Sequence, residues 1–214
     1  MVQAVIFDLD GTLLNTIEDL GEAVNHALSL HGYPLHSLEE YRGMVGHGVR
    51  NLVTQALPRE LQADEGLIDT CLAQFKDYYT AHIDVHTRPY PGMVEVVQQL
   101  HAHGVKLAIA SNKFQSGTET LIAEFFPGIP FVAVLGNRPG YPLKPDPEIV
   151  GEVLRQASAS PSQTVMVGDS LTDMKTASNG GIRGIAVSWG YRFLEPSPAY
   201  ALVHSPSELL SLIL

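Results

Sequence analysis

Near its start the chain reads Val5-Ile6-Phe7-Asp8-Leu9-Asp10-Gly11-Thr12-Leu13, an apolar run that ends in two aspartates and a glycine. The run predicts a buried strand, and Asp-Gly predicts a turn directly after it. Asp8 and Asp10 are two residues apart on an extended chain, so both side chains start on the same side. Ligands bind where the strands of open α/β sheets end, which makes both carboxylates candidate site residues. The alternative is an ordinary Asp-Gly turn at the surface.

The same kind of apolar run recurs along the chain. Further runs occupy residues 105–110, 131–135, 164–167 and 182–187. Each is nearly continuous in apolar character, which is typical of parallel strands that are covered on both faces. Helical periodicity separates several of these runs. The alternation predicts an α/β fold with a doubly wound parallel sheet.

The stretch of residues 16–88 interrupts this alternation with helical patterns alone. Apolar positions between residues 17 and 28 lie on one helical face. Ser37, with Glu40 three residues later, forms the capping box of a second helix, and residues 61–82 indicate at least one more. The pattern predicts an all-helical insertion between the first strand and the rest of the sheet.

Three further polar motifs follow predicted strands: Ser111-Asn112-Lys113, Lys144-Pro145 and Gly168-Asp169-Ser170-Leu171-Thr172-Asp173. Hydroxyl, amide and backbone N–H groups at a strand end can hold phosphoryl oxygens, and Asp169 adds a carboxylate of the kind that holds Mg²⁺. Lys144 stands in a loop stiffened by proline, in a chain with only five lysines; the alternative is a solvated surface lysine. Asp173 has two compatible interpretations, capping its helix with Ser170 and supporting a metal.

In this order the four motifs resemble those of the haloacid dehalogenase superfamily of aspartate-nucleophile phosphatases. That family carries Asp-x-Asp-x-Thr, then Ser or Thr, then a lone Lys, then Gly-Asp-x-x-x-Asp, and the likeness spans nearly the whole chain. The resemblance implies a Rossmann-like core with strand order 3-2-1-4-5, made of residues 1–14 and 88–214. The insertion at residues 15–87 looks like the helical C1-type cap domain of the subgroup that includes phosphoglycolate phosphatases.

The resemblance also implies a role for each matching residue. Asp8 becomes the nucleophile that forms an aspartyl phosphate, and Asp10 the acid that protonates the leaving alcohol and then activates water. The implied cofactor is Mg²⁺, with Asp173 as support for its ligands Asp8, Asp10 and Asp169. Lys144 is implied as catalytic through its positive charge. The residues implied to bind the phosphate are Thr12, Ser111, Asn112 and Lys144.

The insertion contains a glycine-rich segment, Gly43-Met44-Val45-Gly46-His47-Gly48-Val49-Arg50. It looks like the glycine-rich cap segment of phosphoglycolate phosphatases, and in capped members the insertion supplies substrate contacts. The guanidinium of Arg50 suits a carboxylate because it pairs bidentately, so we expect Arg50 and His47 to set substrate specificity. The alternative places Arg50 at an exposed helix start and His47 in a turn.

The expected activity is that of a Mg²⁺-dependent phosphoric monoester hydrolase acting on a small phosphate monoester, with 2-phosphoglycolate as the favoured substrate. The same core would serve an inorganic pyrophosphatase, a nucleotide or sugar phosphatase, or a β-phosphoglucomutase-like phosphomutase. A hydrolytic dehalogenase would not need Asp10. A binding module without activity would not need all four of the residues Asp8, Asp10, Lys144 and Asp169.

Composition bounds the partners and the location. The 214 residues include 13 Lys+Arg and 23 Asp+Glu, for a formal net charge of −10. An acidic surface repels a phosphate backbone, so we expect a small phosphorylated metabolite as partner and no nucleic acid. No apolar run approaches the roughly 18–20 residues that cross a bilayer, so no membrane partner is expected. The single cysteine, Cys71, cannot form a disulfide within the chain, so the sequence does not indicate an oxidising compartment. We therefore expect a cytoplasmic protein, either a monomer or a homodimer.

Overall fold

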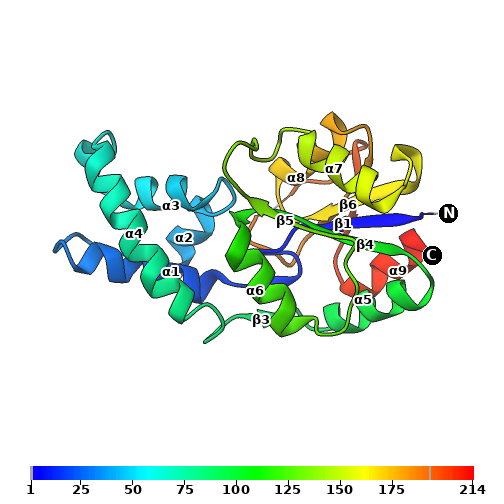
Figure 1. The fold of residues 1–214 in the computed structure, drawn as a ribbon, viewed down its shortest axis with the longest axis horizontal. Coiled ribbons are helices and arrows are strands. Elements are labelled where there is room, and N and C mark those ends of the chain that lie inside the picture. The colour runs from blue at the N-terminus through cyan, green and yellow to red at the C-terminus, as the bar shows by residue number, and fades with distance from the viewer. Residues whose placement is uncertain (1, 193) are drawn as a thin grey trace.

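The computed structural model describes residues 2–192 and 194–214 and has two parts, a sheet-containing core and a helical cap (Figure 1). The core sheet has the strand order β5-β4-β1-β6-β7-β8, and all neighbours are parallel. Its strands are β1 (Ala4–Phe7), β4 (Lys106–Phe114), β5 (Ala133–Asn137), β6 (Thr164–Gly168), β7 (Arg183–Val187) and β8 (Tyr200–Val203). The first five of these strands have the order 3-2-1-4-5, so the predicted α/β sheet is confirmed.

The sheet is covered on both faces because successive side chains of each strand point to opposite sides. Val5 and Phe7 of β1 pack in one core with α5 (Met93–Ala102), α6 (Gln115–Phe125) and α9 (Pro206–Ile213). Ile6, between them, packs in another core with α7 (Glu148–Ala157) and α8 (Leu171–Asn179). Figure 1 shows these two helical layers on either side of the sheet. This burial on two sides explains the continuous apolar runs.

The cap is built from helices inserted after β1. They are α1 (Ile17–Ser29), α2 (Leu38–Met44), α3 (Val49–Ala56) and α4 (Glu65–Ala81), with a 3₁₀ turn η1 (Arg59–Leu61) between the last two. The predicted capping box begins α2: the Ser37 hydroxyl accepts from the Glu40 N–H, and the Glu40 carboxylate accepts from the Ser37 N–H. The all-helical insertion is therefore confirmed.

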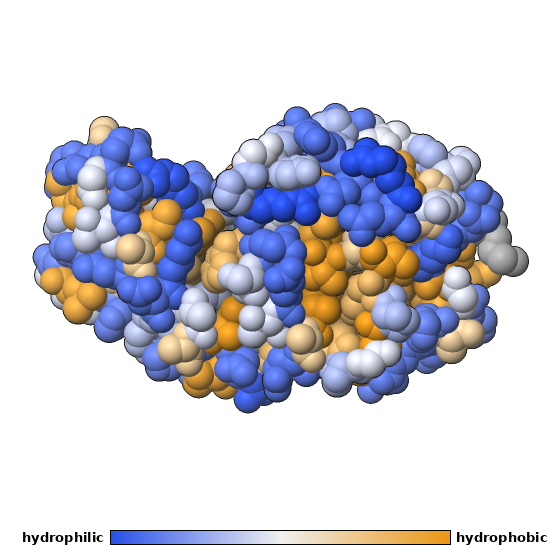
Figure 2. Space-filling view, in the orientation of Figure 1, coloured by the Kyte–Doolittle hydropathy of each residue, from blue (hydrophilic) through white to orange (hydrophobic). Residues whose placement is uncertain are grey.

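An antiparallel ribbon of two short strands, β2 (Leu14–Asn15) and β3 (Arg88–Pro89), joins the cap to the core. The carboxylate of Asp19 in α1 secures this connection. It accepts hydrogen bonds from the N–H groups of His86 and Thr87 at 2.9 and 2.8 Å, and from the Thr87 hydroxyl at 2.7 Å. We infer that the boundary predicted near residues 15 and 87 lies at this ribbon. The molecular surface is indented between the two parts (Figure 2).

The structure adds to the predicted elements at two places. β4 continues past the predicted end of its strand to Phe114, through a register shift after Ala110, so Ser111 to Lys113 belong to the strand end and not to a loop. β8 and α9 were not predicted. β8 is a short edge strand in which only Val203 is buried, so its sequence carries little strand signal. Among the described residues, no helix combines the length and the apolar character needed to cross a membrane.

Candidate active site

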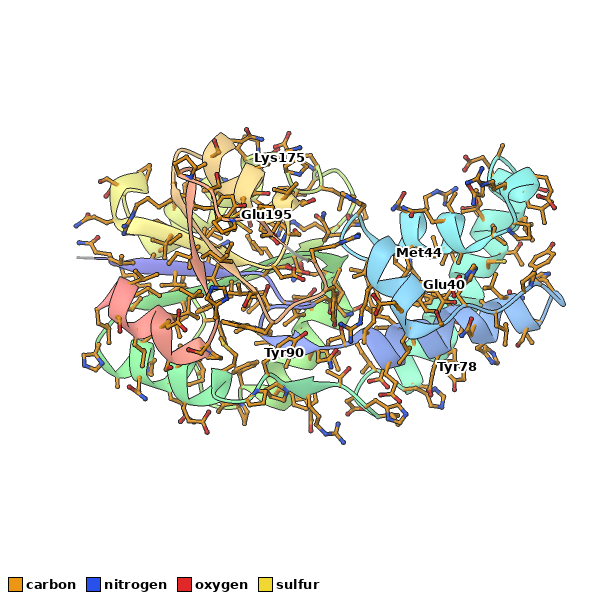
Figure 3. The ribbon with its side chains drawn as sticks, turned by 180° about the vertical axis from the view of Figure 1, so that it is seen from behind. Glu40, Met44, Tyr78, Tyr90, Lys175 and Glu195 are labelled. Carbon is orange, nitrogen blue, oxygen red and sulfur yellow. The ribbon has the colours of Figure 1, made fainter. Side chains whose placement is uncertain are left out.

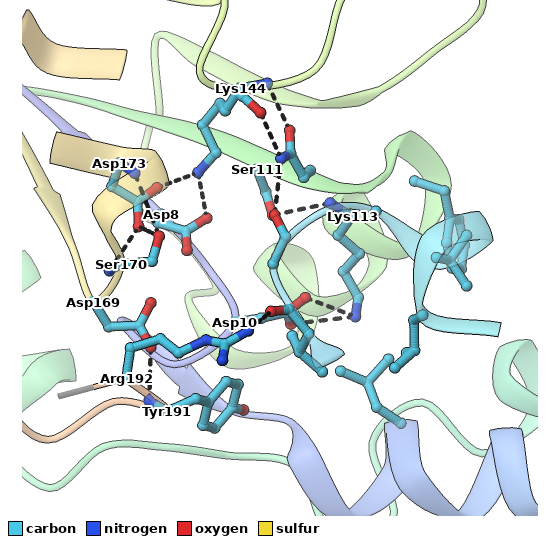
Figure 4. Close-up of a pocket in the computed structure, with 18 of the residues that line it drawn as sticks. Asp8, Asp10, Ser111, Lys113, Lys144, Asp169, Ser170, Asp173, Tyr191 and Arg192 are labelled. Atoms are coloured by element: carbon cyan, nitrogen blue, oxygen red, sulfur yellow. Dashed lines mark hydrogen bonds and ion pairs between the residues drawn. The ribbon is translucent and has the colours of Figure 1, made fainter. Parts of the chain in front are cut away.

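Four segments bring polar side chains to the carboxyl edge of the sheet (Figure 4). Asp8 follows β1, and Asp169 follows β6, its neighbour in the sheet. Lys144 comes from the loop between β5 and α7, and Asp173 lies in the first turn of α8. All four side chains are buried. The structure thus brings together residues from three of the sequence motifs.

Lys144 lies between two carboxylates. Its Nζ donates to Asp8 Oδ1 at 2.7 Å, to Asp173 Oδ1 at 2.6 Å and to the carbonyl of Ala110 at 2.7 Å. Burial lowers the pKa of the lysine, but Asp173 and Asp8 outweigh it and raise that pKa above its ordinary value. The side chain is therefore a permanent buried cation that holds the Asp8 carboxylate in place.

Three carboxylates converge here. One oxygen from each of Asp8, Asp169 and Asp173 lies within 4.8 Å of the others. Burial and then repulsion from Asp173 raise the pKa of Asp8 to about 7. Burial, Asp173 and Asp8 also raise the pKa of Asp169 well above its ordinary value. Three converging carboxylates, of which only Asp8 and Asp173 pair with Lys144, have the chemistry of a site for a divalent cation.

Two glycines leave room for Asp169. A Cβ on Gly190 would lie 2.2 Å from the Asp169 Cβ, and a Cβ on Gly11 would lie 2.4 Å from Asp169 Oδ2. Gly11 also has a φ of +86°, which an L side chain rarely adopts. The Asp-Gly turn after β1 therefore both turns the chain and admits the carboxylate of the neighbouring strand.

The structure confirms that Asp173 caps its helix, and its support of a metal stays a prediction. Ser170 and Asp173 form the capping box of α8, in which Asp173 Oδ2 accepts from the Ser170 N–H at 3.1 Å. Its other oxygen, Oδ1, accepts from Lys144. One carboxylate thus fixes the start of the helix and the position of the lysine, and it belongs to the acidic cluster as well.

Asp10 lines the cavity of the site, but its carboxylate lies outside the acidic cluster. Its Oδ1 accepts from the Thr16 hydroxyl at 2.7 Å and from Lys113 Nζ at 3.2 Å. The predicted role of Asp10 as a metal ligand stays a prediction. In this structure its side chain faces the hinge and the cap.

Lys113 is a site residue to which the sequence motifs assign no role. Its Nζ donates to the Tyr79 hydroxyl of α4 at 2.6 Å and to Asp10, so it links the core to the cap. The side chain is buried, and burial lowers its pKa in spite of the nearby Asp10 charge. The scarcity of lysine is the signal that could have found it, because Lys113 and Lys144 both follow predicted strands.

The residues predicted to bind phosphate are placed differently from one another. Ser111 lines the cavity, and its Oγ accepts from the Lys113 N–H at 3.2 Å. Asn112 also lines it and positions the lysine loop, because its Oδ1 accepts from the Lys144 N–H at 2.8 Å. Thr12 is fully buried and is not among the residues that line the cavity; its hydroxyl has no hydrogen-bond partner among the described residues.

The site opens into a cavity of about 50 Å³ between core and cap. That volume suits a ligand of few atoms, since one water molecule needs roughly 10–15 Å³ by the same measure. The cap side of the cavity is apolar, and its lining side chains are Leu20, Val45, Val49, Leu52 and Phe75. A wall of this kind excludes water from the carboxylates below it.

His47 and Arg50 are not among the residues that line the cavity. His47 is exposed between α2 and α3. Arg50 lies on α3, where its guanidinium forms ion pairs with Glu65 and Asp69 of α4 at the cap surface. The structure does not bring these two residues to the other predicted site residues, and their role in specificity stays a prediction.

The segment after β7 supplies two lining residues that the sequence motifs did not indicate. The Tyr191 N–H donates to Asp169 Oδ2 at 2.7 Å. Arg192 reaches across to the cap, where its Nη2 donates to the carbonyls of Gly43 at 2.6 Å and Val45 at 2.9 Å. No sequence signal marks Arg192, because its partners are backbone groups.

Comparisons with known proteins agree with this geometry. A phosphoglycolate phosphatase of Mesorhizobium japonicum is 36% identical over 199 residues, which cover 90% of this chain and 88% of that protein. One of Vibrio parahaemolyticus is 30% identical over 99% of this chain and 96% of its own. A crystal structure from Lactobacillus delbrueckii, provisionally named a phosphoglycolate phosphatase, has a TM-score of 0.88 at 32% identity and covers 99% of this chain and 98% of its own.

The family itself follows from the profile of the haloacid dehalogenase-like hydrolases, which matches residues 5–187. That range includes the strands β1 and β4 to β7, the cap and every member of the acidic cluster. The resemblance inferred from the four motifs is confirmed, and the chain belongs to the haloacid dehalogenase-like hydrolases.

Proposed function

We propose that this chain is a Mg²⁺-dependent phosphatase that hydrolyses 2-phosphoglycolate through an aspartyl phosphate on Asp8. The observation that carries the proposal is the contact between Asp8 and Lys144 within a buried acidic cluster, at the base of a small cavity that the cap covers. The names of the relatives with 30% identity or more support the substrate.

In the first step, a carboxylate oxygen of Asp8 attacks the phosphorus and the bond to the ester oxygen breaks. The Lys144 ammonium orients Asp8 and balances part of its charge. Asp10 lines the same cavity and, in the proposed step, gives that oxygen a proton.

In the second step, water attacks the phosphorus of the aspartyl phosphate while Asp10 takes the proton from that water. Inorganic phosphate leaves and the Asp8 carboxylate is restored. The apolar cap residues keep other water molecules away. Ser111 and Asn112, at the end of β4, are placed to contact the phosphoryl oxygens.

The residues present fit a divalent metal, since Asp8 and Asp169 offer converging carboxylates next to the proposed point of attack. When bound, Mg²⁺ would offset the charges of the carboxylates and the phosphate and polarise the phosphoryl group. Asp173 would steady the site from the start of α8 through its bonds to Ser170 and Lys144.

A substrate panel tests the function. Phosphate release is measured for 2-phosphoglycolate, ethyl phosphate, pyrophosphate, a nucleotide and a sugar phosphate, each with Mg²⁺ and with a chelator. The proposal expects the highest kcat/KM for 2-phosphoglycolate and no turnover without the metal. A preference for pyrophosphate, the nucleotide or the sugar phosphate would refute 2-phosphoglycolate as the substrate. Full activity with the chelator would refute the requirement for Mg²⁺.

The covalent step is tested by acid quenching. Wild-type enzyme that turns over a ³²P-labelled substrate should carry the label on Asp8, whereas Asp8→Asn should carry none and should lose turnover by roughly 10⁴-fold or more. Asp77→Asn, at an exposed carboxylate of the cap, is the control and should behave as wild type. Label on another residue would refute the proposed nucleophile.

A further inference from the structure

Arg192 is a core residue whose guanidinium lies at the border of cavity and cap. It follows β7 and lines the cavity (Figure 4). Its Nη2 donates to the carbonyls of Gly43 and Val45. Val45 also lines the cavity from the cap side. The two carbonyls therefore hold the guanidinium at the cap end of the cavity, at the edge of the space that a substrate would occupy.

Three cations line the cavity, and their partners differ. Lys144 is paired with Asp8 and Asp173, and Lys113 is paired with Asp10. Arg192 has no carboxylate within 4.0 Å among the residues that the structure describes, and its Nη1 and Nε atoms donate to none of them. It is thus the lining cation that keeps its charge and hydrogen-bond donors for a ligand.

We propose that Arg192 binds the carboxylate of the substrate, an inference that rests on the proposed function. Attack by Asp8 places the phosphoryl group at the base of the site, so the other end of a small ester extends toward the cap. A planar guanidinium with free donors binds a carboxylate more strongly and more specifically than the apolar cap wall can. The contacts to Gly43 and Val45 orient Arg192 for that purpose.

A purely structural role would make Arg192 a latch that holds the cap against the core. The two roles predict different results, because loss of a latch would impair all substrates alike. Loss of a carboxylate partner would impair acidic substrates alone. The ratio of kcat/KM for 2-phosphoglycolate to kcat/KM for ethyl phosphate separates them, since ethyl phosphate has the same carbon chain without the carboxylate.

The variants are Arg192→Ala, Arg192→Gln and, as a control, Arg155→Ala, at an exposed arginine of α7 that does not line the cavity. Glutamine keeps an amide donor for the cap carbonyls but has no charge. We expect both Arg192 variants to lower the ratio by roughly 30-fold or more, mainly through KM, because a charged hydrogen bond is lost. Arg155→Ala should leave the ratio within about twofold of wild type.

Three results would overturn the inference, and they are distinguishable. A wild-type preference for 2-phosphoglycolate that both Arg192 variants retain would show that another group binds the carboxylate, while the proposed substrate stands. Absence of that preference in the wild type would refute the substrate itself and, with it, the role of Arg192. A parallel loss for both substrates would assign Arg192 as a latch only.

Discussion

The two walls of the cavity differ in chemistry. The core wall is polar, and its carboxylates and lysines contact one another through short hydrogen bonds. The cap wall offers apolar side chains, together with backbone carbonyls that hold Arg192. In the proposed function the reaction depends on side chains of the core. The cap side of the cavity is apolar, and its carbonyls position a core residue, Arg192.

The two buried lysines show the same difference. Lys144 contacts only core groups, and these are Asp8, Asp173 and the carbonyl of Ala110. Lys113 contacts both Asp10 and the cap residue Tyr79. A movement of the cap relative to the core would leave the contacts of Lys144 intact and would break the contact between Lys113 and Tyr79.

The largest effect should come from the core lysine. Lys144→Met removes the cation between two buried carboxylates, which should destabilise the fold by about 3–5 kcal/mol and lower kcat/KM by roughly 10²–10³-fold. Denaturant unfolding and steady-state kinetics measure both. Lys175→Met, at an exposed position of α8 (Figure 3), is the matched control and should change neither. Activity within tenfold of wild type would mean that Asp8 does not depend on Lys144.

The raised pKa of Asp8 predicts how the stability of the metal-free protein depends on pH. Because the pKa of Asp8 is raised to about 7, the folded chain holds the Asp8 proton more tightly than the unfolded chain does. The contribution of this group to stability is therefore full at low pH and falls as the pH rises through 7. Asp8→Asn avoids that loss, so in the presence of a chelator the variant should be more stable than wild type. This difference in the free energy of unfolding should be larger at pH 8 than at pH 5 by roughly 1–3 kcal/mol.

The comparison that measures this is the unfolding free energy of wild type, Asp8→Asn and Asp77→Asn at the two pH values. Asp77 is exposed on α4, so its variant should follow the wild type. Added Mg²⁺ should reduce the advantage of Asp8→Asn at pH 8, because the cation offsets the same repulsion. An advantage that does not grow with pH would contradict the raised pKa.

The sequence predicted the core side of the site and missed what crosses to the cap. Asp8 and Asp169 were predicted because each follows a parallel strand and the ends of such strands meet at one edge. The partner of Lys113 lies on α4, and the partners of Arg192 are carbonyls, so neither contact leaves a local pattern. Periodicity and motifs therefore do not predict contacts between elements that are distant in the sequence and meet only in the folded chain.

The cap helices show the same limit. Periodicity and the Ser37 capping box identified the helices, but not how α3 packs on α4. That packing decides the partners of Arg50. They are Glu65 and Asp69, which pair with the guanidinium at the surface. In this structure the carboxylates that pair with Arg50 are therefore side chains of the same protein.

A smaller effect should come from the contact between Lys113 and the cap. Tyr79→Phe keeps the aromatic ring but removes the hydroxyl that accepts from Lys113 Nζ, so it should cost about 0.5–1.5 kcal/mol of stability. Activity should fall less than tenfold, because Lys113 keeps its contact with Asp10. Tyr78→Phe, one residue earlier on α4 (Figure 3), is the matched control, since the Tyr78 hydroxyl forms no hydrogen bond with a described residue. Equal stabilities of the two variants would show that the contact with Lys113 contributes nothing.

The smallest effect should come from Arg50. Its partners Glu65 and Asp69 are 76% and 67% exposed, and Arg50 itself is 45% exposed, so water screens both ion pairs. Exposed pairs of this kind contribute about 0–1 kcal/mol, and Arg50→Ala should change stability by no more than that. Its kcat/KM should stay within about twofold for 2-phosphoglycolate and for ethyl phosphate alike, because the side chain is directed to α4 and not into the cavity. A selective loss for 2-phosphoglycolate would instead mean that α3 turns Arg50 toward the substrate when the cap closes. In that case Arg50 of the cap would bind the substrate carboxylate. The polar groups that contact the substrate would then come from the cap as well as from the core.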